Sequence, residues 1–222
     1  MYLNRSPLGS FFPKPDFVMV HNQCDSKTKW NQLIAEHFGV PYFVVDCSMN
    51  YNPQGDGEGP NIAYMEGQLY DFIDWLKKIT GRDYNYERMI EAVANNYRSK
   101  CLWGEVCRLQ SAVPAPLEYK LLLPFTLALE RHPYEKETVE LFEEVRDEVK
   151  YRVAEGITPL PEEKFRITHE GLAPWYALYL FTYLREHKGA VVGGSQYLVF
   201  TLEVMKPTAE TGLFHPDCPI NW

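Results

Sequence analysis

The chain of 222 residues is 45% hydrophobic and 14% aromatic, a composition that supports a packed core and excludes a disordered protein. Its 30 acidic and 22 basic side chains give a net charge of −8, which argues against a nucleic-acid partner and against binding to a membrane surface. The chain has five cysteines without paired short spacings, no apolar stretch of the roughly 18 residues that cross a bilayer and no signal-peptide pattern, so we expect a cytoplasmic protein.

The first predicted elements form a strand–helix–strand unit. An apolar run at residues 17–20 is predicted to be a buried strand, and residues 27–38 are predicted to be a helix that Gly39 ends. A second buried strand follows at residues 41–46. Two strands joined by a helix within about 30 residues are typical of a βαβ unit, so we expect a parallel sheet. A polar, glycine-containing loop comes next, at residues 50–60.

A helical region fills the middle of the chain. Apolar side chains recur at three- and four-residue steps from Ile62 to Ile79, which predicts a helix over this stretch. Further helices are predicted at residues 86–111, 121–130 and 139–153. These elements are expected to form a helical layer between two sheet regions.

The last part of the chain begins a second strand–helix–strand unit. Strands are predicted at residues 165–170 and 189–193, and the helix between them, at residues 174–187, is expected to be buried on most sides. The predicted fold class is therefore α/β, with two parallel-sheet lobes that are both incomplete. The three segments are a first lobe at residues 1–60, a helical middle region at residues 61–162 and the start of a second lobe at residues 163–222.

Cys24 is the first candidate site residue, because it follows the first predicted strand at the turn before a helix. In a parallel sheet, functional side chains gather at the carboxyl ends of the strands. The positive end of a helix dipole also favours thiolate, the form of cysteine that binds metal or attacks a substrate. Three interpretations stay open from the residues alone: a small buried side chain, a nucleophile with His21 as its base, and a metal or cluster ligand.

The other cysteines are weaker candidates. Cys47 follows the second strand at the same predicted sheet edge as Cys24, where packing and ligation are both considered. Cys101 and Cys107 are six residues apart on one predicted helix and therefore lie on different faces, so we expect them to pack in a core.

Two segments of small residues are candidate substrate-binding turns, and a bare flexible turn is the alternative for the first of them. They contain Gln54, Gly55 and Gly57 in the polar loop, and Gly194 and Ser195 after the last predicted strand. The latter turn again follows a strand at its carboxyl end, where a ligand can approach the backbone. Isolated histidines are expected to be structural, namely His21, His169 and His187.

A resemblance to a known family rests on five segments that follow one another in a particular order and spacing. They are residues 15–30 (PDFVMVHNQCDSKTKW), 38–41 (FGVP), 80–82 (TGR), 170–175 (EGLAPW) and 189–197 (GAVVGGSQY). In this order they resemble the 2-hydroxyacyl-CoA dehydratase and benzoyl-CoA reductase family over nearly the whole chain.

The resemblance implies a fold and a cofactor. The fold is two flavodoxin-like lobes with helices between them, and the cofactor is an oxygen-sensitive [4Fe–4S] cluster. Cys24 matches the cluster ligand of the Cys-Asp turn, and Cys47 is a weaker candidate ligand. In the family, two further ligands lie just before the position of Tyr2 and far downstream, so the chain is expected to be a piece of a longer subunit.

The resemblance also implies a radical reaction on an acyl- or aryl-CoA thioester, with partners. An ATP-hydrolysing activator delivers one electron, and a homologous second subunit completes the enzyme. The run from Gln54 to Gly57 resembles the ring-reductase branch, so a benzoyl-CoA reductase subunit is the first expectation and a 2-hydroxyacyl-CoA dehydratase subunit the alternative. A non-catalytic scaffold subunit without a cluster and an unrelated α/β thiol enzyme stay open as further hypotheses.

Overall fold

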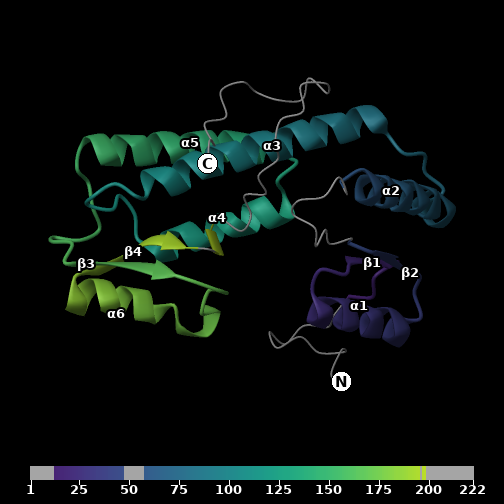
Figure 1. Ribbon diagram of the computed structural model, residues 1–222, viewed down its shortest axis with the longest axis horizontal. Helices are drawn as coiled ribbons and strands as arrows, with labels where there is room; N and C mark the ends of the chain where they lie inside the picture. Colours follow the sequence, from purple (N-terminus) through teal and green to yellow (C-terminus); the bar gives the residue numbers. More distant parts are fainter. Residues whose placement is uncertain (1–12, 48–57, 196, 199–222) are drawn as a thin grey trace. The chain divides into compact units, whose positions relative to one another are not determined.

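The computed structural model describes residues 13–47, 58–195 and 197–198 (Figure 1). The chain divides into two units, Met1–Tyr84 and Asn85–Trp222, and each is described by itself. The division into three segments stays a prediction. The loop residues Gln54, Gly55 and Gly57 lie outside the described residues.

The first unit contains a parallel strand–helix–strand arrangement, which confirms the βαβ prediction. Strand β1 (Val18–His21) pairs residue for residue with β2 (Tyr42–Val45) in parallel. Helix α1 (Asp25–Phe38) connects them and ends at Gly39, whose φ of 61° is a left-handed conformation that glycine adopts without strain. The N–H of this glycine bonds to the Ala35 carbonyl and so closes the helix.

Helices cover both faces of this small sheet, which explains why its strands have continuous apolar sequences. Tyr42 packs on the α1 side, in a cluster that includes buried Ile34. Its neighbour Phe43 contacts Trp75 of α2 (Glu58–Thr80), with ring centroids 5.3 Å apart. Because successive strand residues point to opposite faces, α1 and α2 lie on opposite sides of β2.

Three helices form the main core of the second unit. They are α3 (Tyr86–Leu109), α4 (Tyr119–Arg131) and α5 (Lys136–Ala154), which confirm the three predicted helices, and α3 and α5 lie side by side (Figure 1). The fully buried side chains at their contacts are large and apolar, and include Leu102, Trp103, Val106, Leu122, Leu123, Phe142 and Val149. This core accounts for the three- and four-residue spacing of apolar positions in the sequence.

The second unit also contains a parallel strand pair. Strands β3 (Phe165–His169) and β4 (Ala190–Ser195) pair in parallel, with helix α6 (Tyr179–Lys188) between them in the chain. The prediction that Gly194 and Ser195 form a turn after this strand is wrong, because both lie within β4.

An irregularity in the pairing explains this longer strand. Ile167 pairs with Val192, but the next residue, Thr168, pairs with Gly194, so Gly193 is an extra residue in β4. A Cβ atom at Gly193 would lie 2.8 Å from a side-chain carbon of Arg166, so the strand needs glycine here. The sequence pattern could not distinguish this bulge from a strand end.

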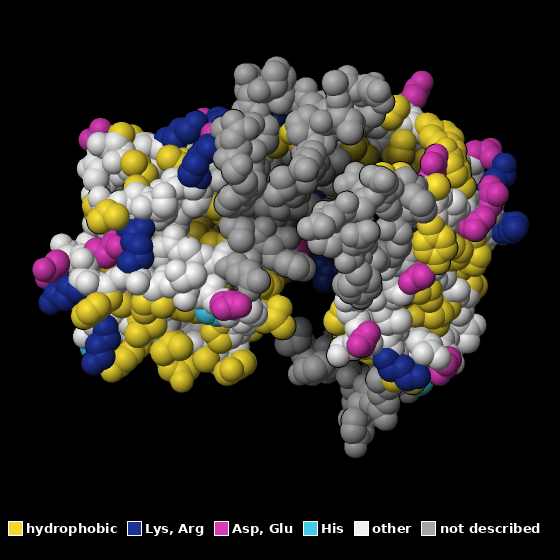
Figure 2. All heavy atoms as spheres, in the orientation of Figure 1, with side chains coloured by type: hydrophobic (Ala, Val, Ile, Leu, Met, Phe, Trp, Pro, Cys, Tyr) yellow, Lys and Arg dark blue, Asp and Glu magenta, His cyan; other side chains and the backbone are white. Residues whose placement is uncertain are grey.

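Helix α6 differs from its prediction in length and in burial. The predicted helix at residues 174–187 divides into a short 3₁₀ turn (Trp175–Ala177) and α6. Phe181 is the buried residue of α6, whereas Tyr176 is 92% and Tyr179 74% exposed, so burial on most sides is wrong. Hydrophobic side chains gather on the outer surface of this region (Figure 2). An aromatic-rich helix that packs on one face of a two-stranded sheet can bury only one stripe of its side chains.

The two units confirm the α/β fold class predicted from the sequence. Each contains one parallel strand pair connected through a helix, which is compatible with two incomplete flavodoxin-like lobes. Within the part of the chain that the structure describes, no helix has both the length and the apolar character needed to cross a bilayer.

Candidate functional site

Cys24 lies at the carboxyl edge of the first sheet, as its sequence position predicts. It is the N-cap residue of α1 and follows β1 after a two-residue turn. Its carbonyl accepts hydrogen bonds from the backbone N–H and the side-chain hydroxyl of Thr28, both at 2.9 Å. Its side chain makes no capping hydrogen bond, and its thiol is free and exposed. Packing as a small buried side chain is therefore excluded for Cys24, and the thiol stands where a helix dipole favours a negative charge.

Asn22 joins the ends of the two strands at this edge. Its backbone N–H bonds to the Val45 carbonyl at 3.2 Å, and its side-chain oxygen accepts a hydrogen bond from the Cys47 backbone N–H at 2.7 Å. Its side-chain amide also donates to the carboxylate of Asp46. Asn22 thus fixes the segment that carries Cys47 against the turn that carries Cys24, as their common position after parallel strands predicts. Cys47 is a free thiol of intermediate exposure.

Helix α2 holds the same edge through Asp46. The Tyr64 hydroxyl donates to the Asp46 carboxylate at 2.8 Å, and the Gln68 side chain bonds both to the Asp46 N–H, at 2.7 Å, and to its carbonyl, at 2.9 Å. The hydrogen bonds from Tyr64 and Asn22 hold the pKa of Asp46 below its ordinary value. The supporting roles of Asn22, Tyr64 and Gln68 are not predictable from local sequence, because each acts through a partner about 20 residues away in the chain.

The donor set for a metal at this edge is incomplete. Among the described residues, no group of three or more His, Cys, Asp or Glu side chains is placed to hold a metal ion. A [4Fe–4S] cluster is held mainly by cysteine thiolates, so Cys24 with Cys47 alone does not fit such a group. His21, at the end of β1, lies 2.8 Å from the Lys27 amine through its Nε2 atom and does not add to a thiolate set.

The edge of the second sheet brings together polar side chains from three elements. Ser195 ends β4 and is buried, and His169 ends β3 directly opposite it. The Ser195 hydroxyl lies 3.1 Å from the hydroxyl of Tyr119, which is the first residue of α4, and 3.4 Å from His169 Nδ1. Tyr119 and His169 Nδ1 are 3.3 Å apart. Two residues at this edge, Gly194 and Ser195, are candidate substrate-binding residues from the sequence. Ser195 belongs to the polar cluster, and Gly194 precedes it in β4.

Two members of this cluster differ from the sequence-based expectation. The sequence predicts an isolated structural histidine at His169 and gives no role to Tyr119, whereas both belong to the cluster. The signal available in the sequence was the position of His169, which falls at a predicted strand end. Nothing in the sequence pattern indicates that Tyr119, 50 residues away from it, reaches the same point.

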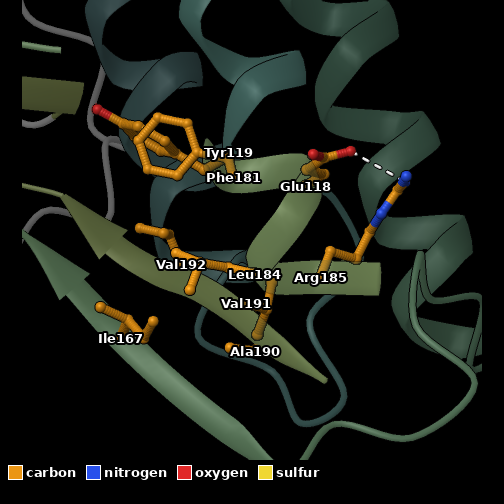
Figure 3. A pocket seen from close by; sticks show the side chains of 9 residues that line it. All are labelled: Glu118, Tyr119, Ile167, Phe181, Leu184, Arg185, Ala190, Val191 and Val192. Carbon is orange, nitrogen blue, oxygen red and sulfur yellow. Dashed lines mark hydrogen bonds and ion pairs between the residues drawn. The ribbon is translucent and has the colours of Figure 1, made fainter. Parts of the chain in front are cut away.

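A small, mainly apolar pocket lies beside the cluster, between α4, α6 and the strands (Figure 3). Tyr119 and Phe181 line one end with rings 4.8 Å apart in a T-shaped arrangement, and the Tyr119 hydroxyl points away from the pocket. At the other end, the Glu118 carboxylate pairs with the Arg185 guanidinium at 3.0 Å. Burial raises the pKa of Tyr119, so its hydroxyl stays protonated near neutral pH. The ring of Tyr119 therefore lines the pocket, whereas its hydroxyl contacts the side chains at the ends of β3 and β4.

A family model and three known proteins that are similar to the chain agree on one family. The family model described as "2-hydroxyglutaryl-CoA dehydratase, D-component" matches residues 2–219. The alpha subunit of (R)-2-hydroxyglutaryl-CoA dehydratase from Acidaminococcus fermentans is 30% identical over 73% of this chain and 34% of its own length. The alpha subunit of (R)-phenyllactyl-CoA dehydratase from Clostridium sporogenes is 28% identical over 79% of this chain and 43% of its length. A benzoyl-CoA reductase subunit from Thauera aromatica is 26% identical over 87% of this chain and 47% of its length. The chain thus spans a third to a half of the length of these relatives.

Proposed function

The chain belongs to the 2-hydroxyglutaryl-CoA dehydratase D-component family, and from this premise we propose that it forms part of an enzyme subunit that acts on a CoA thioester. The match over residues 2–219 carries the proposal. The names of the three relatives, two dehydratases and one reductase, share the CoA thioester as the group that is recognised.

Dehydration of a 2-hydroxyacyl-CoA is the first candidate reaction. It is supported by the two dehydratase alpha subunits, which are 30% and 28% identical to the chain. Reduction of an aryl-CoA ring is the second candidate. It is supported by the reductase subunit, which aligns with 87% of this chain, and by the sequence between Gln54 and Gly57, which lies outside the described residues.

Cys24 is the proposed point of attachment for a [4Fe–4S] cluster in this subunit. Its exposed thiol at a helix N-terminus, on the carboxyl edge of a parallel sheet, supports the proposal. The remaining ligands would have to lie outside the described residues, with Cys47 the weaker candidate on the same edge. Such a cluster would supply single electrons at low potential. The part that this chain plays is to present the thiolate and to fix its turn through Asn22 and the α2 contacts to Asp46.

Two kinds of protein partner belong to the proposal. A homologous second subunit is supported by the names of the relatives, each of which is one subunit of an enzyme. An ATP-hydrolysing activator would deliver the electron. The alternative, a non-catalytic scaffold subunit without a cluster, is favoured by one observation, the incomplete donor set among the described residues.

A turnover assay tests the proposed function. The assembled enzyme, purified without oxygen, would be supplied with (R)-2-hydroxyglutaryl-CoA, phenyllactyl-CoA and benzoyl-CoA in parallel, with an electron donor and ATP. We expect conversion of a 2-hydroxyacyl-CoA to the enoyl-CoA, and loss of this conversion in Cys24→Ser. Conversion of benzoyl-CoA alone would select the second candidate. No conversion of any thioester, or full activity of Cys24→Ser, would contradict the proposal.

A further inference from the structure

At the edge of the second sheet, three polar side-chain groups lie within hydrogen-bond distance of one another, and the proposed function does not use them. They are the Tyr119 hydroxyl, His169 Nδ1 and Ser195 Oγ, which lie between 3.1 and 3.4 Å from one another. The three groups come from the start of α4 and from the ends of β3 and β4. Tyr119 and Ser195 are buried, at 1% and 6% exposure, so their hydroxyl protons need acceptors within the protein.

The donors in this set can be assigned in order. The Tyr197 N–H donates to Ser195 Oγ at 3.2 Å, and Ser195 in turn donates its proton to the Tyr119 oxygen. The single proton of Tyr119 then goes to the lone pair of His169 Nδ1. If the proton of the neutral imidazole were on Nδ1 instead, one of the two hydroxyl protons would have no acceptor among these groups. The assignment that satisfies both hydroxyls therefore puts the imidazole proton on Nε2.

The surroundings of His169 keep its ring in one orientation. Its ring centroid lies 5.3 Å from that of Tyr119 and 5.9 Å from that of Phe181, which approaches edge-on from α6. The imidazole as a whole is only partly buried, and in the described part of the chain no residue pairs with Nε2. The protonated nitrogen is thus held in place with no acceptor among the residues that the structure describes, at the end of a parallel strand where ligands of open α/β sheets bind.

We propose that His169 donates a hydrogen bond from Nε2 to the carbonyl oxygen of the CoA thioester, and that Tyr119 and Ser195 are positioning residues that fix this tautomer. The identity of the ligand rests on the proposed function, whereas the tautomer rests on the contacts alone. A neutral imidazole N–H polarises a carbonyl without giving up its proton, so no proton has to be supplied or removed at this point.

The tautomer is tested by nitrogen NMR on the full chain with ¹⁵N-labelled histidine. We expect His169 to show an unprotonated Nδ1 and a protonated Nε2 at a pH where the ring is neutral. The Ser195 hydroxyl, 3.4 Å from Nδ1, can replace that of Tyr119 as the donor, so only removal of both hydroxyls, in Tyr119→Phe with Ser195→Ala, should produce a mixture of tautomers at His169. The matched control is Tyr183→Phe, because Tyr183 contacts the ring of His187, 4.8 Å away in the same unit, and should leave His169 unchanged. A proton on Nδ1 in the unmodified chain, or an unchanged tautomer in the variant that lacks both hydroxyls, would overturn the assignment.

The ligand is tested by titration with (R)-2-hydroxyglutaryl-CoA and with its thioether analogue, in which a CH₂ group replaces the carbonyl. We expect the thioester, and not the thioether, to shift the Nε2 resonance of His169. His169→Ala should weaken thioester binding by about 3- to 10-fold, the worth of one neutral hydrogen bond, and leave thioether binding unchanged. Equal shifts from both compounds, or none from either, would overturn the ligand assignment. A thioester-specific shift in a protein whose assembled enzyme shows no turnover would contradict the proposed function and support this site.

Discussion

Two of the free thiols, Cys24 and Cys107, should differ strongly in reactivity, although each lies on or beside a helix. Cys24 is exposed, whereas Cys107 packs against the core of the second unit. Burial raises the pKa of Cys107 from 9.0 to about 12. Because only thiolate reacts with iodoacetamide, this rise in pKa lowers the reactive fraction of Cys107 on the order of 1,000-fold at pH 8.

The assay compares the same thiol in two states. Pulses of iodoacetamide at pH 8, followed by peptide mass spectrometry, give the alkylation rate of Cys107 in the native chain and in urea. We expect the native rate to be lower on the order of 1,000-fold, while the exposed thiol of Cys24 shows no such protection. A native Cys107 rate within about tenfold of the unfolded rate would refute the burial argument.

The same shift predicts how stability depends on pH. The folded chain keeps the Cys107 proton up to a pKa of about 12, whereas an unfolded chain releases it near the ordinary value of 9.0. The unfolded state therefore binds fewer protons between these values, and stability falls as the pH rises through this window. In Cys107→Ala, this part of the decrease should be absent from urea unfolding curves measured across the same pH range.

Two further predictions concern the second unit. Phe142→Ala empties a fully buried site and should lower the free energy of unfolding, measured in urea, by about 3–5 kcal/mol. The control is the neighbouring Leu141, which is 38% exposed, so Leu141→Ala should lower it by less than about 1.5 kcal/mol. Equal losses in the two variants would contradict the described core. Glu118→Gln should lower the melting temperature, because it leaves Arg185 without its buried carboxylate, whereas Glu186→Gln removes only the exposed partner of the same guanidinium and should change little. Melting followed by circular dichroism distinguishes the two variants, and identical curves would refute the role assigned to Glu118.

Local signals explain why most of the fold could be predicted. Helices α2 and α3 follow from three- and four-residue spacing of apolar side chains, and the end of α1 at Gly39 follows from the left-handed conformation that this position adopts. The parallel pairing of β1 with β2 follows from chain length, because only a crossover helix fits between the two strands. These are properties that a sequence carries within about 30 residues.

The remaining features depend on contacts that are distant in the chain. The bulge at Gly193 lies where the side chain of Arg166 passes close to the backbone, which no local pattern indicates. The exposure of α6 depends on how many strands lie beneath it. The site shows the same division: the position of Cys24 could be predicted from its strand and helix, but the cluster at His169 joins residues 26 to 76 positions apart. Such a set is visible only after the chain has folded.

The central claim, that Cys24 is a ligand of an iron–sulfur cluster, is tested most directly by iron content. The assembled enzyme would be purified without oxygen as the unmodified protein, as Cys24→Ser and as Cys107→Ala, and its iron and visible absorption would be measured against protein concentration. We predict that Cys24→Ser loses the iron and the broad cluster absorption, while Cys107→Ala keeps both. Full iron content in Cys24→Ser, or an unmodified protein that binds no iron, would contradict the claim.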